Sequence, residues 1–137
     1  MNNRVLIGVI GNDIHVVANK VISRGLRIAG YNVCNLGISN MPKDFIYAAI
    51  EFEADLVIIS TINGEGKDWV VGLRDAYAKS GRGNILLYIG GNLVIGSVSK
   101  SKIEAEYIKL GFNRAYHNPD DLDFLLKDIS KDLDIKK

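Results

Sequence analysis

Short apolar runs alternate with segments of helical periodicity along the chain, and this alternation constrains the fold more than any other feature of the sequence. The apolar runs predict strands, and most are continuously apolar, which is typical of strands that are covered on both faces. These predicted strands occupy residues 5–10, 31–36, 56–60, 84–89 and 114–116. Repeated strand–helix units of this length predict a parallel sheet with helices on both faces.

Each predicted strand is followed by a segment with apolar residues at helical spacing. Val21 and Ile28 belong to the first segment, which Gly30 is expected to end, and Pro42 suits the first turn of the second. The later segments are marked by Gly81 and Gly111 as stops and by Asn118-Pro119 as a cap. We therefore expect a single domain over residues 1–137 with a flavodoxin-like (Rossmann-like) three-layer α/β fold and the strand order 2-1-3-4-5.

The composition fits such a domain and excludes several partners. Of the 137 residues, 47% are hydrophobic, which suffices for one core. Basic and acidic residues nearly balance, at 17 and 16, and no basic stripe is present, so neither nucleic acid nor a membrane surface is an expected partner. No apolar stretch approaches transmembrane length. The single cysteine, Cys34, cannot form an internal disulfide, and the expected location is the cytoplasm.

Chemically distinctive residues follow the first, third and fourth predicted strands. The first loop contains Asp13-Ile14-His15, the third strand ends at Ser60, and the fourth leads into Gly90-Gly91. In an open parallel sheet the carboxyl ends of such strands form the ligand crevice. A neutral imidazole can ligate a metal through one ring nitrogen while a carboxylate holds the other N–H. An isolated Asp-x-His is more often a turn, so the metal-site interpretation depends on the three loops meeting.

Other ligands that are common in this fold class lack their motifs here. Neither the phosphate-loop pattern G-x-x-x-x-G-K-[ST] nor the dinucleotide pattern G-x-G-x-x-G follows the first strand. A phospho-receiver domain would have an aspartate at the end of the third strand, where this chain has Ser60-Thr61. The second histidine, His117, precedes Asn118-Pro119 and is expected to be a turn residue rather than a second metal ligand.

The residues of the three loops resemble the signature of a known family. Cobalamin-binding domains of methionine synthase and of the carbon-skeleton mutases share the pattern D-x-H-x-x-G, then S-x-L, then G-G. This chain has Asp13-x-His15-x-x-Ala18, then Ser60-x-Ile62, then Gly90-Gly91, with 41 and 27 residues in the two gaps. Further stretches, among them Asn63-Gly64-Glu65-Gly66, make nearly the whole chain similar to the small cobalamin-binding subunits of glutamate mutases.

The resemblance implies a role for each matching residue. His15 would displace the dimethylbenzimidazole tail and become the lower axial ligand of cobalt, while Asp13 would accept the other imidazole N–H. The released tail would enter a slot beside the sheet, where Ser60 would hydrogen-bond the buried base and Thr61 and Ile62 would line the same slot. The residues assigned to cofactor binding are Asn12, Asp13, Ile14, His15, Val16, Ser60, Thr61, Ile62, Gly90, Gly91, Asn92, Leu93, Val94, Ile95 and Gly96.

Small residues matter to this implied slot. Gly90 and Gly91 would let the backbone approach the tail closely. Ala18 stands where the signature has glycine, and its methyl group would crowd the tail, whereas Ile62 in place of leucine keeps the volume. A paralogue that no longer binds cobalamin is therefore one alternative hypothesis.

The resemblance also implies an activity. It predicts the cobalamin-binding subunit of an adenosylcobalamin-dependent glutamate mutase, which isomerises L-glutamate to threo-3-methylaspartate. A larger catalytic subunit with a barrel would hold the substrate in a heterotetramer, and this chain alone would be inactive, with no catalytic residue beyond the axial ligand. A corrinoid methyl carrier is the other alternative. Such carriers usually have a helical cap before the first strand, whereas this sequence begins directly at a strand.

Overall fold

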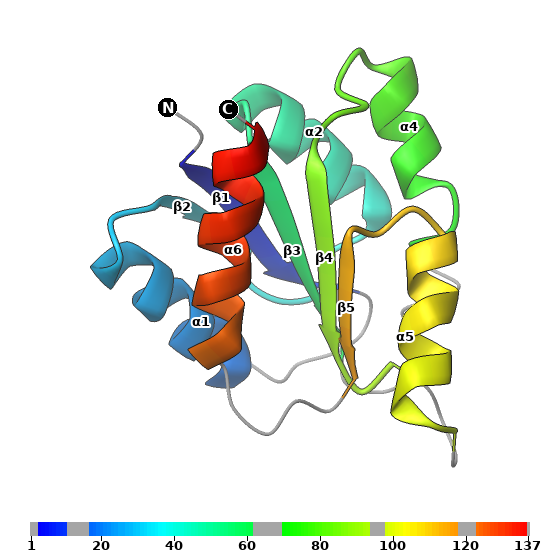
Figure 1. The fold of residues 1–137 in the computed structure, drawn as a ribbon. Coiled ribbons are helices and arrows are strands. Elements are labelled where there is room, and N and C mark those ends of the chain that lie inside the picture. Colours follow the sequence, from blue (N-terminus) through cyan, green and yellow to red (C-terminus); the bar gives the residue numbers. More distant parts are fainter. Residues whose placement is uncertain (1–2, 11–16, 62–69, 94–97, 118–122, 137) are drawn as a thin grey trace.

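The molecule is built on a parallel sheet with the strand order β2-β1-β3-β4-β5, which confirms the predicted fold class and order (Figure 1). The computed structural model describes residues 3–10, 17–61, 70–93, 98–117 and 123–136. The strands are β1 (Arg4–Val9), β2 (Asn32–Asn35), β3 (Leu56–Thr61), β4 (Leu86–Gly91) and β5 (Arg114–His117). The helices are α1 (Val17–Ile28), α2 (Pro42–Phe52), α4 (Leu73–Lys79), α5 (Lys100–Lys109) and α6 (Asp123–Lys136).

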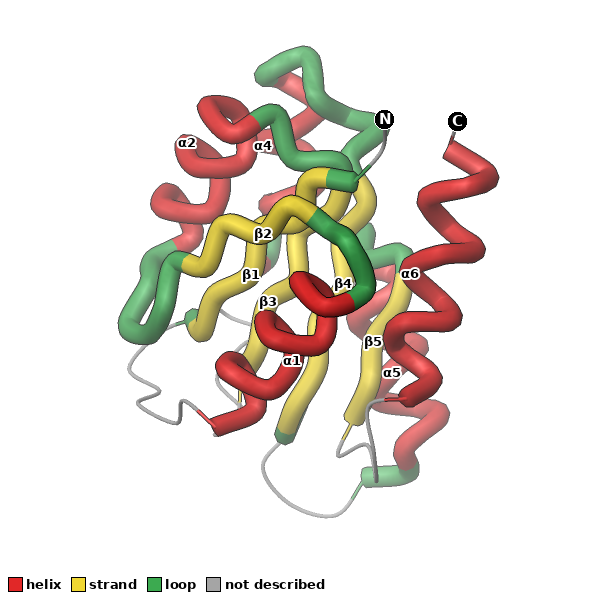
Figure 2. Tube along the Cα trace, turned by 90° about the vertical axis from the view of Figure 1, so that its left-hand side faces the viewer, coloured by secondary structure: helices red, strands yellow, loops and turns green. Residues whose placement is uncertain are grey.

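Two layers of helices cover the sheet, α1 and α6 on one face and α2, α4 and α5 on the other (Figures 1 and 2). On the first face, the buried cluster includes Ile7, Ile58, Tyr88, Leu26 and Ile129. On the second face, it includes Leu6, Ile59, Leu87, Phe45 and Tyr107. Because side chains alternate along a strand, each strand contributes to both clusters. We call these surfaces the α1–α6 face and the α2–α4–α5 face.

Local signals explain several helix boundaries. Pro42 occupies the first turn of α2 as predicted, and the Asp44 carboxylate accepts a hydrogen bond from the Met41 N–H at 2.7 Å. Gly30 has a φ of +97° just after α1, and Gly111 has a φ of +109° after α5, as expected for glycines that end helices. The predicted start of the last helix at Asn118-Pro119 lies outside the described residues.

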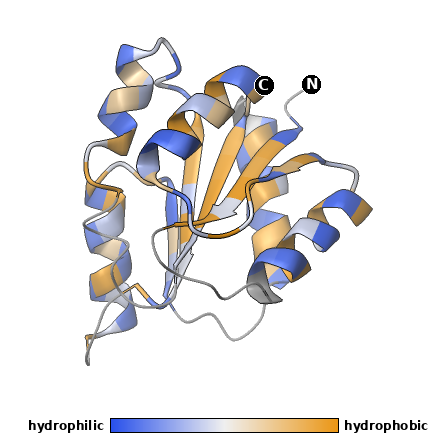
Figure 3. Ribbon diagram, turned by 180° about the vertical axis from the view of Figure 1, so that it is seen from behind, coloured by the Kyte–Doolittle hydropathy of each residue, from blue (hydrophilic) through white to orange (hydrophobic). Residues whose placement is uncertain are grey.

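One strand boundary differs from the prediction and bears on function. The fourth strand was expected over residues 84–89, with Gly90 and Gly91 in the following loop, but β4 runs from Leu86 to Gly91. The two glycines pair with the last residues of β3 and therefore extend the strand although glycine has low strand propensity. Figure 3 shows that the middle of the sheet is hydrophobic and that strands become pale towards their arrowheads.

Among the described residues, none of the helices combines the length and apolar character that crossing a bilayer requires.

Candidate binding site at the carboxyl end of the sheet

The predicted site residues fall into two groups. Ser60, Thr61, Gly90, Gly91, Asn92 and Leu93 are described. Asp13 and His15 lie outside the described residues with the rest of 12–16, as do Ile62, residues 94–96 and the side chain of Ala18. Their assigned roles, including cobalt ligation by His15, therefore stay predictions.

Strand pairing brings the described residues together. Ser60 is paired with Val9 on one side and with Gly90 on the other, and Thr61 is paired with Gly91. The ends of β1, β3 and β4 thus form a single row, as predicted for the three loops. The positions from which the loops depart are adjacent at the carboxyl end of the sheet.

Alternation along the strands separates these residues onto two faces. Ser60 and Gly90 follow Ile58 and Tyr88 by two residues, which places them on the α1–α6 face. Thr61, by the same alternation, follows Ile59 onto the α2–α4–α5 face, where its side chain is 2% exposed. The prediction that Thr61 lines the same slot as Ser60 does not agree with this arrangement.

The two glycines differ in what the fold requires of them. Gly91 has a φ of +120°, and a Cβ there would collide with the Thr61 carbonyl group, so the backbone geometry itself demands glycine. A Cβ on Gly90 would come no closer than 3.6 Å to any of its neighbours, the nearest being the Tyr116 carbonyl oxygen. The packing described does not require glycine at position 90, since a methyl group there would make only ordinary van der Waals contacts with Tyr116.

The end of β1 is held from both sides. Ile10 N–H donates to the Ser60 carbonyl at 3.0 Å. The side chain of Asn40, which is 8% exposed, donates to the Val9 and Gly37 carbonyls at 3.1 and 3.0 Å. The loop that contains Asp13 and His15 therefore leaves from a fixed position. Sequence reasoning missed Asn40, because its partner Val9 lies 31 residues away.

The start of the loop after β4 is also fixed. Leu93 N–H donates to Nδ1 of His117 at 3.1 Å, and the Leu93 carbonyl accepts from the Tyr107 hydroxyl at 3.0 Å. His117 was expected in a turn, but it is the last residue of β5, and its own N–H donates to Glu104 at 2.8 Å. Since Nδ1 accepts a hydrogen bond, a neutral His117 ring has its proton on Nε2. Its observed role is to position the loop.

Helix α1 presents polar side chains to the sheet. Asn19 and Ser23 are 3% and 2% exposed, whereas Val21 and Ile28, from the apolar positions noted in the sequence, are 54% and 76% exposed. The Asn35 amide donates to Oδ1 of Asn19 at 2.8 Å. Within the described part of the chain, neither Nδ2 of Asn19 nor Oγ of Ser23 has a hydrogen-bond partner. Sequence reasoning missed both residues, because they are polar positions on the buried side of the helix, whereas the apolar Val21 and Ile28 are exposed.

Helix α6 is held to β4 and β5 by a charged network. Arg114 donates to both oxygens of Asp132, at 2.7 and 3.0 Å, and the Tyr88 hydroxyl donates to the same carboxylate. The hydrogen bonds from Arg114 lower the pKa of Asp132, and burial with the contact to Asp132 raises the pKa of Tyr88. Tyr116 makes a matching bond to Asp128 at 2.7 Å. These bonds fix the helix that covers the sheet beside α1.

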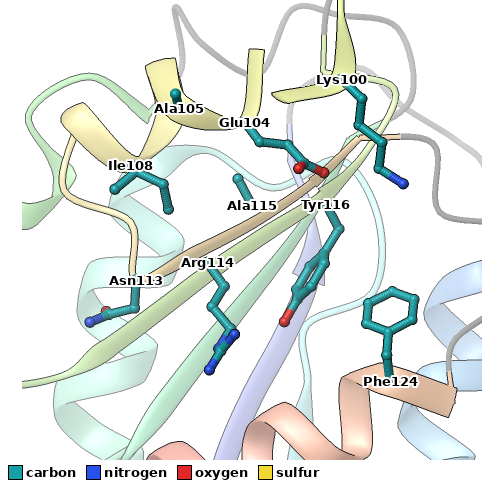
Figure 4. Close-up of a pocket in the computed structure, with 9 residues that line it drawn as sticks. All are labelled: Lys100, Glu104, Ala105, Ile108, Asn113, Arg114, Ala115, Tyr116 and Phe124. Atoms are coloured by element: carbon teal, nitrogen blue, oxygen red, sulfur yellow. The ribbon is translucent and has the colours of Figure 1, made fainter. Parts of the chain in front are cut away.

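A pocket of about 460 Å³ lies at the outer side of β5, between α5 and the start of α6 (Figure 4). Glu104 and Lys100 border it from α5, and Tyr116 and Phe124 border it from the other side. The pocket contains none of the residues predicted to bind a cofactor.

Known proteins resemble this chain over most of its length. The family model described as "B12 binding domain" matches residues 3–112. The chain is 37% identical to the "Glutamate mutase sigma subunit" of Clostridium tetani, over 96% of both chains. It is 39% identical to the protein of the same name from Yersinia enterocolitica, over 97% of this chain and 90% of that one.

Solved structures share the fold at lower identity. A cobalamin-binding protein from Desulfitobacterium hafniense superposes with a TM-score of 0.65 at 20% identity, over 85% of this chain and 53% of that one. The receiver domain of the response regulator NarL from Mycobacterium tuberculosis gives the same TM-score at 12% identity, over 97% of both chains. At 20% and 12% identity, these two matches show the fold alone.

Proposed function

The chain belongs to the B12-binding domain family and, within it, to the glutamate mutase sigma subunits, and from this premise we propose how it serves that enzyme. It is the cobalamin-binding subunit, and the reaction is the isomerisation of L-glutamate to threo-3-methylaspartate. The cofactor is adenosylcobalamin, and the subunit acts in the cytoplasm.

The observation that carries the proposal lies at the carboxyl end of the α1–α6 face. Ser60 and Gly90 are paired there, and the packing described does not require glycine at position 90. The side chains of Asn19 and Ser23 are buried on α1, and each has a hydrogen-bonding group without a partner among the described residues. Small strand residues and unsatisfied polar atoms suit a flat, polar organic group such as the nucleotide tail of cobalamin.

The chain's own residues have binding and orienting roles. His15 would ligate the cobalt, and Asp13 would hold the imidazole by its second N–H, which would set the ring orientation and raise its basicity. Ser60 would hydrogen-bond the tail, and Gly90 would give it room. When bound, the cofactor supplies the radical chemistry that the rearrangement needs. Asn40, His117 and Tyr107 hold the departure points of the loops by the hydrogen bonds described above.

Substrate recognition is assigned to a second protein. A substrate with two carboxylates is best held by paired arginines. Two arginines of the described chain are engaged within the fold: Arg74 donates to the Gly111 and Ile85 carbonyls, and Arg114 is bound to Asp132. A larger catalytic subunit with a barrel therefore covers the cofactor and binds the substrate, in a heterotetramer, and this chain alone is inactive.

Reconstitution with the cognate larger subunit tests this proposal. The chain, the larger subunit and their mixture are each incubated with adenosylcobalamin and L-glutamate, and 3-methylaspartate is measured. We expect 3-methylaspartate to form only when the chain and the larger subunit are mixed. Turnover by this chain alone would contradict the assignment of substrate binding to the larger subunit. A cobalamin-loaded complex that transfers methyl groups instead of isomerising glutamate would establish the corrinoid-carrier alternative.

A further inference from the structure

The backbone that leaves β4 is held by hydrogen bonds that meet at Leu93. Its N–H donates to Nδ1 of His117 at 3.1 Å, and its carbonyl accepts from the Tyr107 hydroxyl at 3.0 Å. One residue earlier, Asn92 N–H donates to the Thr61 carbonyl at 2.9 Å. The loop that we assign to cofactor binding therefore begins at a point fixed by β3, α5 and β5.

His117 is itself held by the same face of α5. Ala115, two residues earlier, is buried in the core of the α2–α4–α5 face, so alternation places the His117 side chain on that face. The His117 N–H donates to the Glu104 carboxylate at 2.8 Å. Glu104 and Tyr107 are three residues apart on α5 and therefore lie on one side of the helix. One side of α5 thus supports both His117 and Leu93.

The hydrogen bond from Leu93 requires a neutral imidazole. Nδ1 accepts the N–H through its lone pair, and the lone pair is lost when the ring takes up a second proton, because both nitrogens of an imidazolium are donors. Two N–H groups would then face each other across the same contact. Histidine is the side chain that ordinarily gains this proton near neutral pH, at about pH 6.5. Mildly acidic solution therefore removes one of the bonds that hold Leu93.

The charged groups around His117 include a carboxylate that suits a positively charged ring. On the α2–α4–α5 face, Glu104 and Lys100 of α5 border the pocket beside β5 (Figure 4). On the opposite face, the carboxylates of α6 that reach β5 are bound to its other side chains, and these are Asp128 and Asp132. Glu104 gives a protonated His117 a counter-charge, whereas Lys100 opposes the added charge. The ring thus has a countering group on the helix that already holds it.

We propose that His117 is a positioning residue for the cofactor-binding loop after β4 and that it fills this role only as a neutral imidazole. The affinity of this chain for cobalamin then falls in mildly acidic solution, beyond any fall caused by protonation of His15. The consequence for the cofactor rests on the proposed function, whereas the release of the Leu93 N–H does not. Because the bond from Tyr107 remains, the fold itself is kept.

Amide hydrogen exchange in the free protein, followed by nuclear magnetic resonance, tests the release of Leu93. The protection factor of its amide is measured at about pH 7.5 and about pH 5.5 in the wild type and in His117→Asn, whose side-chain oxygen accepts the same bond without titrating. We expect a fall of about three- to tenfold at the lower pH in the wild type and none in the variant. The Asn92 amide, bound to Thr61, is the internal control. Equal protection of Leu93 at both pH values in the wild type would overturn the proposal.

Cobalamin titration tests the consequence for binding. Affinities are measured by corrin absorbance at the same two pH values for the wild type, His117→Asn and His117→Ala. His15 is present in all three proteins, so the effect of its own protonation is common to them. We expect the wild type to lose about three- to tenfold more affinity than His117→Asn at the lower pH, and His117→Ala to bind more weakly than His117→Asn at the higher one. Ser101→Asn, at an exposed position of α5, is the matched control and should follow the wild type.

The outcomes separate this inference from the proposed function. A merely structural histidine would give lower melting temperatures for both His117 variants and the same pH dependence of binding as the wild type, which would overturn the inference. His117→Ala with wild-type affinity at both pH values would also overturn it. A wild type that binds no cobalamin at either pH would refute the proposed function, and the protection factor of Leu93 would still decide whether His117 holds the loop.

Discussion

The two faces of the sheet differ in how fully their buried side chains are packed and hydrogen-bonded. On the α2–α4–α5 face, large side chains fill the layer, and the hydroxyls of Tyr77 and Tyr107 donate to the Phe45 and Leu93 carbonyls at 2.7 and 3.0 Å. On the α1–α6 face, Leu26, Tyr88 and Ile129 belong to the buried cluster. The carboxyl-terminal half of this face contains Gly90 and the unpaired groups of Asn19 and Ser23.

This difference indicates where a ligand belongs. A face whose packing and hydrogen bonds are complete has nothing to gain from a ligand, whereas an incomplete one does. Thr61 is an exception on the complete face, because its buried hydroxyl has no partner among the residues described. The comparison predicts that substitutions on the complete face change stability, and that substitutions at the incomplete end change cofactor affinity with little effect on stability.

The largest effect is expected from truncation of the complete core. Phe45 is fully buried, and a Cβ on Gly8 would come within 3.0 Å of its ring. Phe45→Ala should therefore lower the free energy of unfolding by about 3–5 kcal/mol, measured by urea denaturation. Tyr47→Ala, at a 70% exposed position on the same helix, is the control and should have little effect. Equal losses in the two variants would show that the layer is not packed as described.

Gly90 and Gly91 should respond differently to substitution by alanine. Gly91→Ala forces an alanine into a positive φ against the Thr61 carbonyl, which should cost about 2–3 kcal/mol of stability. Gly90→Ala should change the stability of the free protein by less than about 0.5 kcal/mol, yet weaken cobalamin binding. Urea denaturation and corrin titration measure the two quantities. A Gly90→Ala protein that binds cobalamin with wild-type affinity would refute the space assigned to the tail.

The network under α6 should make stability depend on pH. Asp132→Asn weakens the paired bond from Arg114, so we expect a loss of about 1–2 kcal/mol at pH 7. The pKa of Asp132 is lowered in the folded state, so its contribution is present above the pKa of the unfolded carboxyl, about 4. It is lost as the pH falls through the folded pKa. The stability difference between wild type and variant, measured from pH 7 to pH 2, should shrink in that range, and a constant difference would contradict this assignment.

The smallest effect is expected at Thr61. Thr61→Val removes a buried hydroxyl that has no partner and keeps the shape and the strand propensity of the side chain. The free protein should become more stable, by at most about 1 kcal/mol, in urea denaturation. A loss of stability would mean that the hydroxyl has a partner in solution, and the contrast between the two faces would then be stronger.

The sequence predicts those features that depend on neighbours close along the chain. Continuous apolar runs identify β1 and β3 because burial on both faces leaves no polar positions, and Pro42 and Gly30 act through their own backbone angles. The strand order follows from the rules for parallel sheets. The three loops could be placed at one end of the sheet for the same reason.

Features that depend on distant partners could not be predicted in this way. Gly90 and Gly91 belong to β4 only because β3 and β5 pair with them, and His117 becomes a loop support only through Leu93. The sequence did not reveal which face of α1 turns inward, because Val21 and Ile28 are apolar but exposed. Polar residues turned inward are the expected failure of a hydrophobic pattern at a functional site.

The central claim is that this chain binds cobalamin with His15 in place of the cofactor's own base. Its most direct test is the electron paramagnetic resonance spectrum of cob(II)alamin mixed with the chain, prepared with ¹⁵N-labelled histidine and compared with His15→Ala. We predict a nitrogen superhyperfine coupling that changes with the label and disappears in the variant. A spectrum identical to that of free cob(II)alamin at high protein concentration would contradict the claim and favour a paralogue in which Ala18 has closed the site.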